Sequence, residues 1–226
     1  MDFNIETKNG HIHMTPKNGK YTHIIIFLHG LGDSPKSYES FFLDENVLPE
    51  NCQIKIILMQ SPFLMMNGFP FPSWFSITQF PIVSDDCYNF QEAEKSSQKI
   101  KDLIEEEVKL IGGKYENVFV GGFSQGACLS LHTGLTYKHL IGGVISLSGA
   151  LFSQTKILES NKTLKIFVGH GKKDEVIPYN TNQESLKRIE NFTGLCKYSY
   201  PNLAHSIANK EVLDLKNFLL KCITCK

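Results

Sequence analysis

Short β-branched runs alternate with longer amphipathic patterns along most of this chain, and this alternation constrains its fold more than any other feature. The runs typical of strands lie at residues 22–28, 54–58, 117–120, 143–147, 164–168 and 197–200. The helical patterns lie at residues 91–111, 125–137, 182–192 and 210–222. Strand, helix and strand repeated in this order favour an α/β fold, with a mainly parallel central sheet and helices on both faces.

The first residues depart from this alternation and predict an antiparallel hairpin. Apolar residues such as Ile5 and Ile12 alternate with polar ones on both sides of Asn9-Gly10. A two-residue type I′ turn requires a positive φ at both central residues, and Asn-Gly meets that requirement. We therefore expect an antiparallel N-terminal hairpin at one edge of the sheet.

The composition agrees with a single domain over residues 1–226. Hydrophobic residues make up 42% of the chain, and 23 Lys plus Arg balance 23 Asp plus Glu, so no basic excess marks a nucleic-acid binder. The longest apolar stretches, such as residues 24–28, are far shorter than the roughly 20 residues of a membrane-spanning helix. Because the opening residues are polar, unlike a secretory signal, we expect a cytoplasmic protein with no nucleic-acid partner.

Six cysteines are spread along the chain, mostly in apolar surroundings. This pattern favours buried reduced thiols over a disulfide framework. Cys222 and Cys225 form a lone C-x-x-C without a second pair to complete a zinc site, so we expect no metal.

The segment PFLMMNGFPFPSWF, residues 62–75, is unusually apolar for a connection. Its three prolines are incompatible with a regular helix or a central strand. The segment either packs as irregular cover over the core or lines a cavity that accepts an apolar ligand.

The pattern G-x-S-x-G occurs once, around Ser124, and its setting gives it weight. A β-type run precedes it at residues 117–121 and a helical pattern follows from Gln125. Strand, sharp turn and helix is the context of a nucleophile elbow, which exposes the serine above the sheet at a helix N-terminus. Ser124 is therefore the candidate nucleophile.

A serine nucleophile requires a histidine base and a carboxylate that orients it. In the α/β-hydrolase order the acid follows the serine and the histidine comes last. Of the eight histidines, His205 satisfies this order. Asp174 is the sole aspartate between Ser124 and His205, and it follows a predicted strand, with Glu175 as the fallback.

Acyl transfer also requires donors for the oxyanion of the tetrahedral intermediate. The backbone N–H of Gln125 directly follows the nucleophile at the start of a helix. A second N–H should come from the turn after the strand at residues 22–28, where the sequence reads HGLGD, and Leu31 is our choice.

Together these residues resemble the acyl-protein thioesterase branch of the α/β-hydrolases, also called the lysophospholipase and carboxylesterase family. The matching pieces are FLHGLGD at residues 27–33, FPSWF at 71–75, GGFSQGA at 121–127, HGKKDEVIP at 170–178, and AHS around His205. The resemblance implies the same triad and the same oxyanion amides. It further implies that an apolar lid at about residues 62–80 binds the acyl chain through Phe63, Leu64, Met65, Phe69, Phe71, Trp74 and Phe75.

The chain departs from the family pattern without losing a proposed catalytic group. Ser76 stands where an aspartate is usual, and Lys172-Lys173 make the acid loop basic. The function expected is a serine hydrolase without a cofactor, which removes long acyl chains from protein cysteines through an acyl-enzyme. An esterase acting on lysophospholipids or other small lipid esters is the alternative, and a catalytically silent binding module is a further one. The apolar lid favours transient membrane contact or a homodimer.

Overall fold

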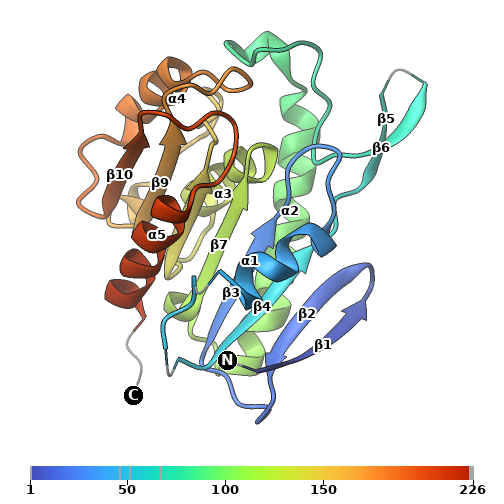
Figure 1. Ribbon diagram of the computed structural model, residues 1–226, viewed down its shortest axis with the longest axis vertical. Helices are drawn as coiled ribbons and strands as arrows, with labels where there is room; N and C mark the ends of the chain where they lie inside the picture. The colour runs from blue at the N-terminus through green and yellow to red at the C-terminus, as the bar shows by residue number, and fades with distance from the viewer. Residues whose placement is uncertain (1, 46, 51, 67, 224–226) are drawn as a thin grey trace.

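The computed structural model describes residues 2–45, 47–50, 52–66 and 68–223. Within these residues, eight strands form a twisted sheet in the order β1-β2-β4-β3-β7-β8-β9-β10 (Figure 1). Strands β3 to β10 of this sheet are parallel, and β2 joins β4 antiparallel. The strands are β1 Phe3–Lys8, β2 His11–Pro16, β3 His23–Leu28, β4 Ile54–Met59, β7 Val118–Phe123, β8 Gly143–Leu147, β9 Ile166–Gly171 and β10 Leu195–Tyr200. The predicted α/β class is confirmed.

Helices cover both faces of the sheet, as the sequence pattern predicted. They are α1 Glu39–Leu43, α2 Phe90–Glu107, α3 Gln125–Thr136, α4 Tyr179–Leu186 and α5 Asn209–Cys222. Side chains of β3 alternate between two cores: Ile24 and Ile26 pack with α2 and α3, whereas Ile25 and Phe27 pack with α1 and α5. Because β3 is covered on both sides, every one of its residues is buried, which explains its continuous apolar run.

Two helix boundaries differ from the prediction for local reasons. The helix expected at residues 91–111 changes after Glu107 into a 3-10 turn, Val108–Ile111, and ends at Gly112, whose φ is 74°. The helix expected at 182–192 begins earlier, at Tyr179, directly after Pro178. Proline is accepted at a helix start because the first N–H groups have no partner within the helix.

The N-terminal hairpin is confirmed. Strands β1 and β2 pair antiparallel from Phe3 opposite Pro16 to Lys8 opposite His11. Asn9 and Gly10 have φ values of 54° and 81°, as a type I′ turn requires.

The proline-rich segment forms a small sheet of its own, so irregular cover over the core, one of the two alternatives, does not describe most of it. Strands β5 (Phe63–Met66) and β6 (Phe69–Pro72) make a two-stranded antiparallel hairpin that projects from the body of the molecule (Figure 1). Pro70 and Pro72 are two residues apart on β6, so both point their nitrogens to the same edge. A two-stranded sheet leaves that edge unpaired, so the missing N–H groups remove no ladder hydrogen bond.

The cysteines correct another expectation. Cys87, Cys128, Cys196 and Cys222 carry free thiols, but Cys52 is disulfide-bonded, so the prediction of reduced thiols is wrong for Cys52. Cys225, the second cysteine of the C-x-x-C, lies outside the described residues. None of the helices in the described ranges combines the length and the apolar character needed to cross a membrane.

Candidate active site

Ser124 lies at the sharp turn between β7 and α3, where the chain leaves the carboxyl edge of the sheet. Its φ of 55° and ψ of −117° are rare for a non-glycine residue and mark backbone strain. The flanking glycines permit this turn, because a β-carbon on Gly122 would meet the Gly126 backbone and one on Gly126 would meet the Leu28 carbonyl. The sequence pattern thus follows from close backbone packing around the serine.

The structure brings the predicted serine, histidine and aspartate together. His205, in the loop between β10 and α5, has its Nε2 atom 2.8 Å from Ser124 Oγ. The His205 Nδ1 atom lies 2.7 Å from Oδ2 of Asp174, which follows β9. The His205 ring also lies 4.9 Å from the Phe123 ring, centroid to centroid. The fallback carboxylate, Glu175, is exposed to solvent.

The surroundings of Asp174 favour its ionised form. Its Oδ1 atom accepts hydrogen bonds of 2.9 Å from the N–H groups of Val176 and Ile177. Burial alone would raise the pKa of Asp174, but the hydrogen bond and charge of His205 and these two N–H groups outweigh burial and lower it. His170 is also near, with Nε2 at 3.4 Å from Asp174 Oδ2, but it is fully buried and contacts the Ile177 carbonyl at 2.8 Å.

The turn after β3 lies directly beside the nucleophile. A β-carbon on Gly30 would stand 3.5 Å from Ser124 Cβ. The N–H of Gly32 donates to the Pro72 carbonyl, and that of Asp33 to the Gly30 carbonyl. No described residue accepts a hydrogen bond from the N–H of Leu31, the donor chosen from the sequence.

An apolar pocket of about 500 Å³ lies against α3, and none of Ser124, Asp174 and His205 belongs to its lining. Cys128 forms part of its wall, and the Cys128 N–H donates to the Ser124 carbonyl at 3.1 Å. The apolar lining consists of Phe75, Ile82, Val83, Tyr88, Cys128, Ala150, Leu151 and Phe152. Arg188 holds one wall through hydrogen bonds to the carbonyls of Phe152, Ser153 and Thr155.

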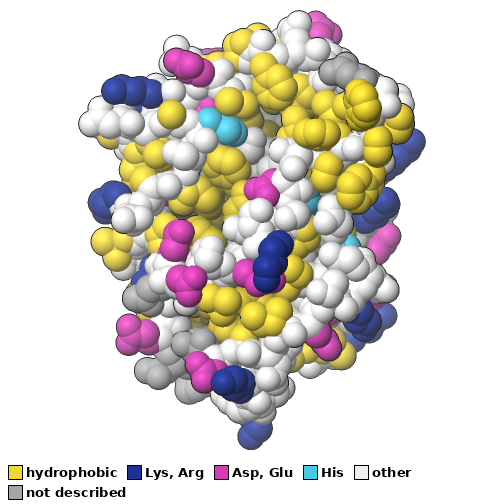
Figure 2. All heavy atoms as spheres, turned by 45° about the vertical axis from the view of Figure 1, so that its right-hand side comes forward, with side chains coloured by type: hydrophobic (Ala, Val, Ile, Leu, Met, Phe, Trp, Pro, Cys, Tyr) yellow, Lys and Arg dark blue, Asp and Glu magenta, His cyan; other side chains and the backbone are white. Residues whose placement is uncertain are grey.

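The seven residues expected to bind the acyl chain occupy two different environments. Phe63, Met65 and Phe69 are 64%, 68% and 73% exposed on the hairpin, with Leu64 and Phe71 beside them. Figure 2 shows the hydrophobic side chains gathered on that side of the molecule. Trp74 and Phe75 are instead 1% exposed, and of the seven only Phe75 lines the apolar pocket. The pocket residues from 82 to 88 and 150 to 152 were missed because an apolar pocket wall and an apolar core have the same sequence signature.

Two further observations concern the position of Ser76 and the side chains that could bind a metal ion. At the family's usual aspartate position, the backbone N–H of Ser76 donates to Glu92 Oε2 at 2.6 Å. Among the described residues, no group of three or more His, Cys, Asp or Glu side chains could hold a metal ion.

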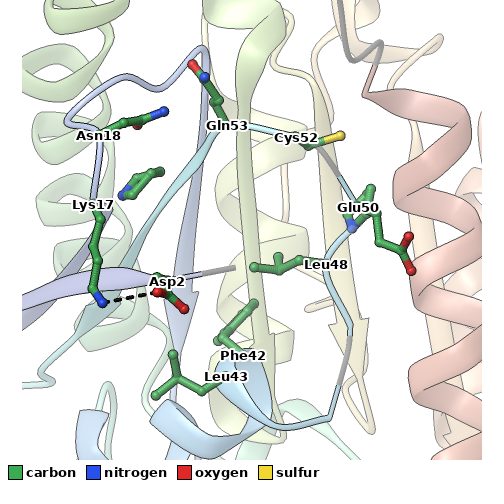
Figure 3. A pocket seen from close by; sticks show the side chains of 11 residues that line it. Asp2, Lys17, Asn18, Phe42, Leu43, Leu48, Glu50, Cys52 and Gln53 are labelled. Atoms are coloured by element: carbon green, nitrogen blue, oxygen red, sulfur yellow. Dashed lines mark hydrogen bonds and ion pairs between the residues drawn. The ribbon is translucent and has the colours of Figure 1, made fainter.

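Another cavity, of about 660 Å³, lies near the amino ends of β3 and β4 (Figure 3). Phe42 and Leu48 contribute apolar surface, and the ion pair of Asp2 with Lys17 lies at its rim. None of its lining residues belongs to the triad or the turn after β3. It is separate from the candidate active site.

A mainly parallel sheet that carries a serine, a histidine and a carboxylate in hydrogen-bond contact at its carboxyl edge is the arrangement of serine hydrolases with the α/β-hydrolase fold. The comparison with known families agrees: the model of the phospholipase/carboxylesterase family matches residues 9–223. The chain belongs to that family of serine hydrolases.

Individual relatives cover nearly the whole chain. Acyl-protein thioesterase 1 of Mycosarcoma maydis is 34% identical over 93% of this chain and 95% of its own length. Acyl-protein thioesterase 1 of Kluyveromyces lactis is 33% identical over 88% and 92%. Among solved structures, Zea mays acyl-protein thioesterase 2 has a TM-score of 0.76 at 25% identity, covering 93% of this chain and 97% of that one. Arabidopsis thaliana SOBER1 has a TM-score of 0.78 at 26% identity, covering 88% and 98%.

Proposed function

We propose that this protein hydrolyses long-chain acyl thioesters of protein cysteines through a covalent acyl-enzyme, within one domain of residues 1–226. The observation that carries the proposal is the continuous hydrogen-bonded contact from Ser124 Oγ through His205 to Asp174. The names of its relatives, acyl-protein thioesterase 1, support the substrate class.

The reaction starts when Ser124 Oγ attacks the thioester carbonyl carbon and His205 Nε2 accepts the hydroxyl proton. Asp174 holds the Nδ1–H tautomer of His205 and stabilises the imidazolium. The N–H groups of Leu31 and Gln125 donate to the oxyanion of the tetrahedral intermediate. The C–S bond then breaks, and His205 returns the proton to the departing thiolate. Water attacks the acyl-enzyme by the same route, losing its proton to His205, and releases the fatty acid.

Thioesters are favoured substrates because of their leaving group. A cysteine thiol has a pKa of about 8.5, far below that of an alcohol, so the thiolate departs with less help from the acid. Oxygen esters remain chemically accessible to the same residues. An esterase acting on lysophospholipids is therefore the second candidate, and the family description, phospholipase/carboxylesterase, favours it.

We propose that the acyl chain binds in the apolar pocket that lies against α3. Its volume of about 500 Å³ lies within the range of roughly 300–1,000 Å³ typical of small-molecule sites. Cys128, in the pocket wall, lies one helical turn from Ser124 along α3, and this proximity supports the pocket as the acyl site.

The hairpin β5–β6 is proposed as the membrane-facing part of a lid formed by residues 62–80. Three large side chains, Phe63, Met65 and Phe69, are more than 60% exposed on it. Such a patch favours contact with a lipid surface, where acylated substrates are held. Pairing of two copies through the same hairpin is the alternative use of this surface.

We also propose that the protein acts in the cytoplasm. Four of the described cysteines carry free thiols, which a reducing compartment preserves, whereas the disulfide bond of Cys52 is more typical of an oxidising one. Fluorescence microscopy of the tagged full chain tests this location, and a signal confined to secretory compartments contradicts it.

The central experiment measures hydrolysis of thioesters and oxygen esters of matched acyl length by the wild type and by Ser124→Ala. We expect turnover to rise with acyl length on sulfur and to fall at least about 1,000-fold in Ser124→Ala. A fluorophosphonate should label wild-type Ser124 and leave Ser124→Ala unlabelled. Equal rates at all acyl lengths would exclude the long-chain substrate, and an unlabelled wild type would exclude the hydrolase.

A further inference from the structure

We propose that Trp74 is a positioning residue that sets the distance between the two oxyanion-hole amides, with the side chain of Gln125 as its partner. The inference rests on the proposed function, because it assigns a role in that reaction. It also replaces the acyl-binding role expected for Trp74, whose side chain is 1% exposed.

Trp74 is hydrogen-bonded to both halves of the proposed oxyanion hole. Its indole Nε1–H donates to the His29 carbonyl at 2.8 Å, at the start of the turn that contains Leu31. Its backbone N–H donates to Gln125 Oε1 at 2.8 Å. One residue therefore links the turn after β3 to the residue that follows the nucleophile.

The Gln125 side chain is fully used in this link. Besides accepting from Trp74, it donates through Nε2 to the Phe75 carbonyl at 2.5 Å and lies 3.1 Å from Ser73 Oγ. Gln125 and Ser73 are both buried, so water cannot replace these bonds. The side chain thus holds the backbone of residues 73–75 against the start of α3.

The turn after β3 is fixed in the same way. His29 Nδ1 lies 2.7 Å from the Gly30 carbonyl, and His29 Nε2 accepts the N–H of Ser61 at 3.2 Å. These contacts require a neutral His29 with its proton on Nδ1, and burial lowers the pKa of His29 accordingly. The Trp74 and His29 rings also lie in contact, with centroids 5.3 Å apart.

The root of the hairpin adds a second connection. The N–H of Gly32 donates to the Pro72 carbonyl at 2.8 Å, and the Phe71 ring fills the space that a side chain at position 32 would need. Residues 71–75 therefore contact the turn and the nucleophile elbow at several points. Because oxyanion donors act only within about 2.7–3.1 Å of the oxygen, small shifts in their separation reduce transition-state stabilisation.

The test compares Trp74→Phe with Tyr137→Phe. Trp74→Phe keeps an aromatic ring but removes the indole donor. Tyr137→Phe is the matched control, since it also removes one hydrogen bond of a buried aromatic side chain, that of Tyr137 Oη to Glu105 at 2.8 Å. Tyr137 directly follows the end of α3 that is remote from Ser124. We expect kcat to fall about 10- to 100-fold in Trp74→Phe, with KM changed less than about twofold, and to be unchanged in Tyr137→Phe.

An alkyl trifluoromethyl ketone supplies a readout that a general loss of stability would not move. It forms a tetrahedral adduct with the serine, so its Ki should rise in Trp74→Phe by the same factor as kcat falls. Gln125→Met keeps the backbone amide and should show the same fall in kcat and the same rise in Ki. If Trp74→Phe does not fold, Gln125→Met alone tests the proposed role of Trp74. An active, folded Trp74→Phe or Gln125→Met with wild-type kcat and Ki would overturn the role of Trp74, whereas an inactive wild type would overturn the proposed function instead.

Discussion

Asp174 and His205 are joined by a hydrogen bond of 2.7 Å, and two backbone donors fix the orientation of the carboxylate that makes it. The side chain of Asp174 is completely buried, and its second oxygen accepts the N–H groups of Val176 and Ile177. The carboxylate cannot rotate without losing these two donors. It therefore imposes one tautomer on His205, with Nε2 facing Ser124 Oγ.

Asp174→Asn should lower kcat by about 10⁴-fold with little change in fold. The asparagine oxygen will accept the N–H groups of Val176 and Ile177, so its NH₂ will face His205 Nδ1. The imidazole must then carry its proton on Nε2, which prevents it from accepting the Ser124 proton. Steady-state kinetics measure the effect. Glu175→Gln, the exposed neighbour, serves as the control and should keep wild-type turnover.

Glu211→Gln should make stability less dependent on pH. Glu211 is fully buried against Gly169, and neither carboxyl oxygen has a hydrogen-bond partner among the described residues. Burial raises the pKa of Glu211 to about 8 from 4.5. Between those pH values the folded state holds a proton that the unfolded state has lost, so the contribution of Glu211 to stability is fully present below about pH 4.5 and is lost progressively as the pH rises to about 8.

Urea unfolding at several pH values measures this contribution. The slope of unfolding free energy against pH should be more negative in the wild type than in Glu211→Gln over that window. The exposed carboxylate variant Glu45→Gln is the control and should follow the wild type. Parallel curves for the wild type and Glu211→Gln would refute the raised pKa.

Ala150→Phe should shorten the preferred acyl chain. Ala150 lines the apolar pocket, so a benzyl group there occupies volume that a long chain would use. We expect kcat/KM for a sixteen-carbon thioester to fall at least about tenfold, and that for a four-carbon thioester to change less than about threefold. Leu140→Phe, at a position 42% exposed outside the pocket, is the control. An equal loss for both chain lengths would argue against this pocket as the acyl site.

Replacing Phe63 and Phe69 together by serine should weaken binding to anionic lipid vesicles about tenfold or more, because both side chains are largely exposed on the hairpin. Hydrolysis of a short, freely dissolved thioester should be preserved. Co-sedimentation with vesicles gives the bound fraction. Leu110→Ser removes an equally exposed apolar side chain, 63% accessible beyond the end of α2, and should leave binding unchanged. Unaltered sedimentation of the double variant would remove the membrane role of the hairpin, and a change confined to its oligomeric state would favour the homodimer.

The sequence predicted most of the fold because strands and helices differ in their apolar period. Continuous apolar runs such as β3 are buried on both faces, and the Asn9-Gly10 turn has the φ values that its residue types predict. The ends of some strands were not predicted correctly where tertiary packing outweighs the local conformational preference of the residues. Gly121 and Gly122 look unsuited to a strand, yet they extend β7, because the close approach of neighbouring backbone at Gly122 leaves no room for a side chain.

The candidate site was predictable where chemistry fixes the residue type. A serine in a strained turn, a late histidine and an intervening aspartate were sufficient to select three side chains that the structure brings together. The acyl site was less accessible to such reasoning. Trp74 looked like part of an apolar surface, but the hydrogen bonds of its indole and backbone depend on His29 and Gln125, which are distant in sequence.

Trp74 is the only tryptophan of the chain. When the excitation wavelength is chosen so that the tyrosines do not absorb, the fluorescence of the molecule therefore originates at the junction between the turn after β3 and the nucleophile elbow. Entry of water at that junction would shift the tryptophan emission to longer wavelength. Rapid-mixing measurements can thus follow this one spot during acylation and deacylation in the unlabelled protein.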